Sequence, residues 1–192
     1  DVSVATVLGR IRTDGANRGL LLLNGLAELS PAAAQGLASF DGDISLNGLN
    51  SITPEVAVAL SQRSPWTALY LDGLNEVTPQ VALALAKCHG ELSLCGLTTL
   101  SLPLARALAQ HEGTHLLLDG VNELTAEVAA TLAGHGFAAK EKGIPSTLSL
   151  NGVSSLSLEE AKRLRWHQGM LFLDGLSSIT PEVAKALAQH KG

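Results

Sequence analysis

Histidine is the residue type whose spacing in this chain first suggests chemistry. Four histidines follow a glycine at the same interval of fifteen residues: His111, His135, His167 and His190. Cys88 stands at the same interval in an earlier unit, and His89 follows it. Imidazole and thiolate groups in one column could hold a transition-metal ion. The column is also expected at helix ends, where histidine can bond to free carbonyl groups, and we favour this capping role.

A second column is acidic or amidic. Six of seven regularly spaced glycines follow an Asn or Asp directly, and Cys95 takes this place in the remaining unit: Asn24, Asn47, Asp72, Asp119, Asn151 and Asp174. The carboxylates suggest calcium, but Asp72, Asp119 and Asp174 belong to alternate units and are expected about 10 Å apart. Hydrogen bonds from these side chains to turn backbone are the favoured interpretation.

Catalytic chemistry is not indicated. Ser, His and Asp recur as repeat positions, and the sequence contains no nucleophile elbow or phosphate-binding loop. We therefore expect neither an enzyme nor a cofactor, and no metal site beyond the weak histidine alternative. Cys88 and Cys95 are expected at a helix end and after the next strand, which predicts two free thiols.

The elements that position these residues repeat with a regular period. Seven glycines are separated by 23, 25, 23, 24, 32 and 23 residues: Gly25, Gly48, Gly73, Gly96, Gly120, Gly152 and Gly175. Such a period indicates units that bury their apolar faces only by stacking on their neighbours. The sequence predicts about seven strand-turn-helix repeats over residues 20–192, in one α/β solenoid domain with one parallel sheet.

Each unit has the same local signals. A pattern such as Ile44-Ser45-Leu46 alternates inward and outward side chains, as in a short strand. The glycine that follows is expected to supply a backbone conformation that a Cβ disfavours. A hydroxyl residue and a proline then begin a helix, as in Thr53-Pro54 and Thr78-Pro79.

Three segments depart from the pattern. Residues 1–19 are expected to form a partial preceding repeat, with a helix and then a link. Residues 136–147 contain an inserted loop rich in Gly, Pro and charge. In the sixth unit, Glu160 and Arg165 replace small buried residues, so its helix is expected to pack differently.

Composition limits the possible partners. Hydrophobic residues make up 46% of the 192, but aromatic residues only 3%, as in a core of many aliphatic side chains. A net charge of −5 does not indicate the positively charged surface that binds nucleic acid. No apolar run approaches the roughly 20 residues of a transmembrane helix. The sequence leaves the compartment undetermined.

One outward column alternates in character. The residues between the strand leucines are apolar in odd units and serine in even units: Leu22, Ser45, Tyr70, Ser93, Leu117, Ser149 and Phe172. Three residues after the glycine, Glu28, Glu76 and Glu123 alternate with Ser or Thr. The alternation could be left over from duplication of repeat units in pairs. Alternatively, its apolar members, which we call the knobs, could form a surface that binds a partner: Leu22, Tyr70, Leu117 and Phe172. Both interpretations stay open.

The repeat resembles the bacterial leucine-rich repeats, in particular the short class of about 23 residues. In the third unit Leu69, Leu71, Leu74, Val77, Val81 and Leu85 occupy the apolar positions of that repeat. The Asn or Asp before the glycine and the Thr-Pro cap depart from most members. The resemblance implies a right-handed solenoid whose strand face recognises protein or glycan, and it implies no particular ligand.

Two functions from different classes follow. The first is a non-catalytic interaction or scaffold module, part of a longer protein, that binds a protein partner or a second copy through Leu22, Tyr70, Leu117, Phe172, Glu28, Glu76 and Glu123. The second is a self-assembling structural element of a bacterial surface or envelope layer, because neither end shows a polar capping unit. The cell surface and the periplasm are the compartments considered. A metal-binding array through the histidine column is a third, weaker possibility.

Overall fold

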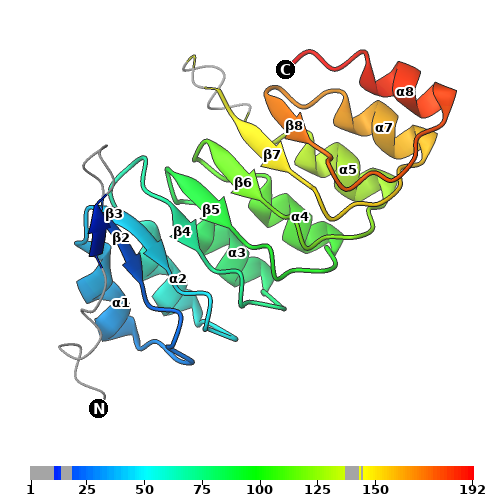
Figure 1. Cartoon of the computed structure of the whole chain (residues 1–192). Helices are drawn as coiled ribbons and strands as arrows, with labels where there is room; N and C mark the ends of the chain where they lie inside the picture. Colours follow the sequence, from blue (N-terminus) through cyan, green and yellow to red (C-terminus); the bar gives the residue numbers. More distant parts are fainter. Residues whose placement is uncertain (1–10, 14–18, 137–142, 144) are drawn as a thin grey trace.

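A computed structural model describes residues 11–13, 19–136, 143 and 145–192. The chain forms an open α/β solenoid, with a sheet along one side and helices along the other (Figure 1). Strands β2 to β8 are parallel and lie in sequence order, while β1 pairs with β2 in the antiparallel sense. The predicted fold class, with strand-turn-helix repeats around one parallel sheet, is confirmed.

The repeats have short elements of similar length. The strands are β1 (Ile11–Thr13), β2 (Gly19–Leu22), β3 (Gly42–Ser45), β4 (Leu69–Tyr70), β5 (Glu91–Ser93), β6 (His115–Leu117), β7 (Thr147–Ser149) and β8 (Met170–Phe172). The helices are α1 (Pro31–Ala38), α2 (Pro54–Ser61), α3 (Pro79–Leu85), α4 (Leu102–Leu108), α5 (Ala126–Leu132), α7 (Leu158–Leu164) and α8 (Pro181–Leu187). We number the coils one to seven, from β2 with α1 to β8 with α8.

The core lies between the sheet and the helices. The inward leucines of the middle strands are fully buried, as Leu71 and Leu94 illustrate at 0% exposure. Helix residues such as Ala82 and Leu85 cover them, also at 0%. Small alanines let the helices approach the sheet closely, so many aliphatic contacts replace the few aromatic residues of a conventional core.

The predicted helix starts are confirmed. A Ser or Thr side chain accepts a hydrogen bond from the backbone N–H three residues later at every described helix: Ser30, Thr53, Thr78, Ser101, Thr125, Ser157 and Thr180. Proline occupies one of the first two helical positions in five of these helices. Each cap satisfies a backbone donor that the short helix leaves unpaired.

The expectation that the repeat glycines supply a backbone conformation unfavourable for other residues is wrong. None of them has a positive φ, because in the described chain only Gly136, Gly143 and Trp66 do. Instead, a Cβ at Gly73 would lie under 3.0 Å from the carbonyl oxygens of Asn47 and Leu49 in the preceding coil. The glycine is needed because successive coils approach closely there.

The sixth coil is less unusual than expected. Helix α7 has the length of its neighbours and buries Ala161 and Leu164. Glu160 turns its carboxylate back to accept a hydrogen bond of 2.7 Å from the backbone N–H of Ser157, which completes a capping box. Arg165 lies at the helix C-cap and bonds to Gln189 of the next coil. Polar residues are therefore placed at the helix ends, and the packing is preserved.

The two irregular regions are described in part. Strand β1 lies within the segment expected to link the partial repeat to the first coil, whereas the helix expected before it lies outside the described residues. Most of the predicted insertion, residues 137–142 and 144, also lies outside them. Ser146 and Thr147, at its end, are buried.

Candidate interaction face and histidine column

The outward residues between the strand leucines form one continuous ladder. Strand register pairs Ser45 with Tyr70, Tyr70 with Ser93, and each later member with the next. Leu22 and Phe172 are 40% and 41% exposed, while Tyr70 and Leu117 are half-buried. The strands that carry the ladder lie along the side of the solenoid opposite the helices (Figure 1). The predicted apolar knobs therefore share one face.

The serines between the knobs are buried by specific contacts. The hydroxyl of Ser93 donates to Oδ1 of Asp72 at 2.5 Å, and Ser93 is 2% exposed. Ser45 donates to Asn24 in the same way. The third pair is Ser149 with Asp119. Each even coil is thereby joined to the odd coil before it, which gives the alternation a structural role.

The Asn and Asp column bonds to backbone, as predicted, but to that of the next coil. Asn47 Oδ1 accepts from the N–H of Asp72 at 2.9 Å, and Asp72 Oδ1 accepts from the N–H of Cys95 at 3.0 Å. The same contact recurs from Asn24, Asp119 and Asn151. The carboxylates are thus engaged in holding coils together, and a calcium role finds no support in their arrangement.

Tyr70 lies at the centre of a carboxylate-rich part of the face. Burial is the main cause that raises its pKa, and the negative charges of Glu91 and Asp43 and a hydrogen bond to Glu91 act in the same direction. The phenol therefore stays protonated and can donate at neutral pH. It offers a partner both an apolar ring and a polar tip.

The predicted glutamates border this face. Glu28, Glu76 and Glu123 are exposed, in the loops between the strand turns and the helix caps of alternate coils. Glu76 also lines a shallow groove of about 320 Å³, between the loops of coils two and three. Asn50, Ser51, Ile52, Val77, Thr78 and Val81 complete its lining. The apolar knobs and the glutamates thus lie on neighbouring parts of one surface.

Positive charge is confined to one side of the described coils, whereas carboxylates lie on both sides. From the start of each parallel strand to the next helix cap, the chain carries eight carboxylates and no lysine or arginine. The eight are Glu28, Asp43, Asp72, Glu76, Glu91, Asp119, Glu123 and Asp174. In the same seven coils, every lysine and arginine whose side chain is described belongs to a helix or to the segment after it. The strand face is therefore apolar and acidic.

The histidine column lies at the corner between each helix and the following strand. His111 Nδ1 is 3.2 Å from His135 Nε2, with ring centroids 5.5 Å apart and ring planes 12° apart. The distance between the two nitrogens plus the radius of each ring equals the distance between the ring centroids, so both nitrogens lie on the line that joins the centroids. The two rings therefore meet edge to edge. His167 and His190 continue the row, with centroid separations of 5.8 and 6.2 Å.

Capping by histidine is seen only at the end of this row. His190 lies 2.8 Å through Nε2 from the carbonyl of Gly169 and 3.4 Å through Nδ1 from that of Arg165, both in the preceding coil. His111, His135 and His167 are buried at 4%, 0% and 0% exposure. Among the described residues, His111 Nε2, His135 Nδ1 and both His167 nitrogens lack a hydrogen-bond partner.

Burial dominates the protonation of these rings. Desolvation is the main cause that lowers the pKa of His111 to about 4 and that of His135 to about 2. It also lowers the pKa of His167 to about 4, although backbone groups near Met170, Ala133 and His135 favour the charged ring. The three imidazoles are therefore neutral at neutral pH.

The row does not assemble a metal-ligand set. The contact between His111 and His135 brings two ring nitrogens together, whereas protein zinc sites use three or four ligands. No group of three or more His, Cys, Asp or Glu with suitable geometry occurs in the part of the chain that the structure describes. The arrangement gives the metal alternative no support.

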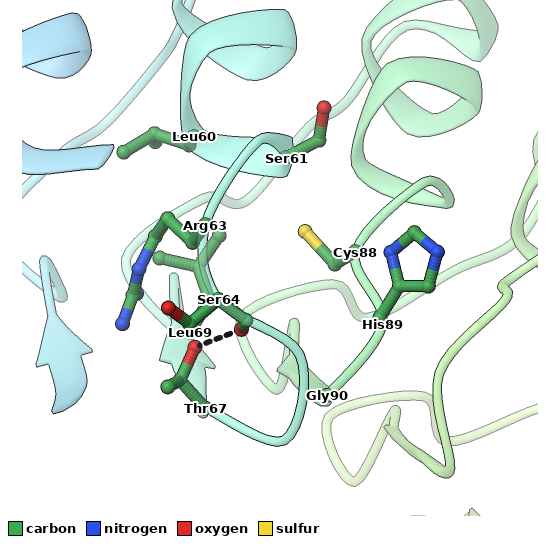
Figure 2. Close-up of a pocket in the computed structure, with 9 residues that line it drawn as sticks. All are labelled: Leu60, Ser61, Arg63, Ser64, Thr67, Leu69, Cys88, His89 and Gly90. Carbon is green, nitrogen blue, oxygen red and sulfur yellow. Dashed lines mark hydrogen bonds between the residues drawn. The ribbon is translucent and has the colours of Figure 1, made fainter. Parts of the chain in front are cut away.

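The same corner position holds other residue types in the first coils. Arg63 donates to the carbonyls of Ala68 and Gly42, and Cys88 lies in the next coil. Between them is a cavity of about one water molecule, lined also by Thr67 and Gly90 (Figure 2). Both cysteines are free, and burial raises the pKa of Cys88 to about 12. A protonated, buried thiol is a poor nucleophile.

Some features of these sites were not predicted. Met170 is 46% exposed beside Phe172 and enlarges the apolar part of the strand face in the seventh coil. Arg63 and Phe40 belong to the histidine column, and the interval of fifteen residues after the glycine could have identified them. Trp66 and Trp166 are 53% and 57% exposed, and no repeat position predicts them.

Comparison with other proteins adds no identity. The chain matches no protein-family model and no curated protein sequence. Among the described residues, no helix has both the length and the hydropathy to cross a bilayer. The geometry of the strand face therefore carries the functional interpretation.

Proposed function

We propose that this chain is a non-catalytic interaction module of the leucine-rich-repeat type, which binds a protein partner through its strand face. The supporting observation is the ladder of Leu22, Tyr70, Leu117 and Phe172 on a surface that has no lysine or arginine between strand and helix cap. Apolar groups rimmed by polar ones characterise protein interfaces. Glu28, Glu76 and Glu123 make a basic segment with apolar side chains the partner of best charge complementarity.

The spacing of the knobs defines such a partner further. Knobs lie on alternate strands, so they are separated by about 10 Å. The serines between them lie deeper in the face, at 2% to 4% exposure. A partner side chain can therefore occupy the space above each serine, between two knobs.

The test measures binding of a labelled peptide in which lysine and leucine alternate. Tyr70→Ser combined with Phe172→Ser is expected to weaken binding at least about tenfold, because large central anchors dominate interface energies. Val58→Ser combined with Leu83→Ser is the matched control, since these helix residues are 47% and 43% exposed. Equal affinity of the two double variants would refute a role for the knobs.

A charge experiment tests the same face independently. Replacing Glu28, Glu76 and Glu123 by Gln is expected to weaken binding of the lysine-leucine peptide and to reduce its dependence on salt. The control replaces Glu55, Glu127 and Glu182, which lie in first turns of helices and are exposed. Both triples change the net charge equally, so a difference between them locates the interaction on the strand face.

Self-association through the end of the sheet is the second candidate. At β8, Met170 and Phe172 are exposed, and the inward residues Leu171 and Leu173 are only partly buried. Among the described strands β8 has a neighbour on one side only, and such an apolar edge can pair with a strand of a second copy or of a further repeat. Light scattering over a wide concentration range tests this proposal, with Met170→Lys expected to abolish association. A monomer at every concentration argues against assembly.

A further inference from the structure

The corner column divides the solenoid into two chemically different halves. It reads, one residue per coil, Phe40, Arg63, Cys88, His111, His135, His167 and His190. The first three coils contribute no imidazole, while each of the last four contributes one. Because each coil of a solenoid contacts only its neighbours, a change at these histidines acts on one half first.

The contact between His111 and His135 has no place for a second proton. In the His111–His135 contact one ring donates and the other accepts, as two neutral rings can. Protonating the accepting nitrogen would place two N–H groups against each other. Protonating His135 Nδ1, which has no partner among the described residues, would leave a buried cation without an acceptor.

The surrounding charges do not compensate. His89, His115 and Glu112 face His111, and His115 also faces His135. Glu112 is the carboxylate of this set, and it lies 2.5 Å from Lys87 and 3.5 Å from His89. Cys88, the next member of the column, is buried and neutral. His167 is faced by His190, and the backbone groups near Met170, Ala133 and His135 offset only part of its desolvation. Protonation of neighbouring histidines thus adds repulsion.

We propose that the histidine column makes one half of the solenoid unfold in acid. Protonation of His111, His135 and His167 opens coils four to seven, while coils one to three stay folded. An unfolded histidine binds its proton near the ordinary pKa of 6.5, whereas burial lowers the pKa of each folded ring. Unfolding therefore takes up protons, so stability is complete above about pH 6.5 and falls as the pH decreases. Carboxylates titrate at lower pH.

Hydrogen exchange resolved along the chain tests this proposal. Between about pH 6.5 and about pH 5.5, each buried ring raises the opening equilibrium constant about fivefold, because the unfolded ring is already half protonated at pH 6.5. Between about pH 6.5 and about pH 5.5, protection of α5 and α7, corrected for the intrinsic exchange rate, is expected to fall about 150-fold. Protection of α2 is expected to change less than about threefold, because its coil contributes Arg63 to the column.

Two substitutions at one position keep the test decisive. His135→Phe removes one titrating ring and is expected to reduce the change to about 30-fold. His135→Cys serves if the phenyl ring prevents folding, since Cys88 occupies the same position in coil three. His89→Gln is the control, because His89 is exposed, and it should keep the full response. Loss of protection equally in α2 and α5, or an unchanged response in both His135 variants, overturns the proposal.

Discussion

Ser93 donates its hydroxyl hydrogen to Oδ1 of Asp72 across the boundary between coils three and four, at 2.5 Å. The same carboxylate oxygen accepts the backbone N–H of Cys95 at 3.0 Å. One side chain thus holds a neighbouring strand through both its backbone and its outward residue. The serines of the alternating column therefore join coils in pairs, in addition to any role in binding. We call this contact between a serine and the Asn or Asp of the preceding coil the serine lock.

Removing this lock should destabilise the solenoid. Ser93→Ala is expected to lower the free energy of unfolding by about 1.5 kcal/mol, because a hydrogen bond to a charged group is lost at a buried site. Urea denaturation measures the change. The control Ser155→Ala alters an exposed loop serine and should stay within about 0.5 kcal/mol of the wild type. Equal midpoints for the two variants would show that the lock contributes nothing.

The repeat glycines offer an internal comparison. Gly73→Ala brings a Cβ against the backbone carbonyls of Asn47 and Leu49, so the two coils must separate. We expect a loss of about 2 kcal/mol or more in the free energy of unfolding. Among the described residues, a Cβ at Gly25 would meet no heavy atom within 4 Å beyond its chain neighbours, and Gly25→Ala should change stability by less than about 0.5 kcal/mol. Similar losses of stability in Gly73→Ala and Gly25→Ala would show that close approach of neighbouring coils is not the reason for the glycine.

Tyr70 can be titrated without ambiguity, because it is the only tyrosine in the chain. Burial and the charge of Glu91 raise its pKa, so the absorbance of tyrosinate should be absent from the folded protein at about pH 10. In urea the phenol should ionise near its ordinary pKa of about 10. Glu91→Gln should lower the pKa in the folded protein. A folded-state titration identical to that in urea would place Tyr70 outside this acidic part of the face.

Alkaline pH should also weaken the fold through Cys88. Burial raises the pKa of its thiol to about 12, from an ordinary value of 9.0. Between these values the unfolded thiol loses its proton and the folded one keeps it, so stability is complete below about pH 9 and falls as pH rises. Urea denaturation of Cys88→Ala should show a smaller alkaline loss than the wild type. Cys95→Ala is the comparison, since Cys95 is less buried.

The sequence was most informative where one coil determines its own structure. The Leu-x-Leu alternation and the hydroxyl caps, such as Thr78 before Pro79, act within a few residues and predict strands and helix starts. Period alone then predicts the stacking and the column of Leu22, Tyr70, Leu117 and Phe172. Whether these residues bind a partner depends on a second molecule, which neither pattern nor period describes.

Contacts between coils were harder to predict. The reason for Gly73 lies in the carbonyl of Asn47, and the reason for Ser93 lies in the carboxylate of Asp72. Both partners are more than twenty residues away in sequence. Helix α7 shows the same limit, because Glu160 has a buried equivalent in other coils but instead folds back to its own cap. The burial of His135 likewise depends on packing that spacing alone does not reveal.

The hydrogen bonds of Ser45, Ser93 and Ser149 each join an even-numbered coil to the odd-numbered coil before it. The effect of removing coils therefore depends on how many are removed. Excising one coil would create a junction between two coils of the same kind, such as one that places Asp72 beside Asp119 on adjacent strands. Two carboxylates about 5 Å apart repel each other, and no serine would be present to donate to the first. Excising two consecutive coils restores the original junctions. Insertion or deletion of coils in pairs is therefore expected to preserve stability better than insertion or deletion of a single coil.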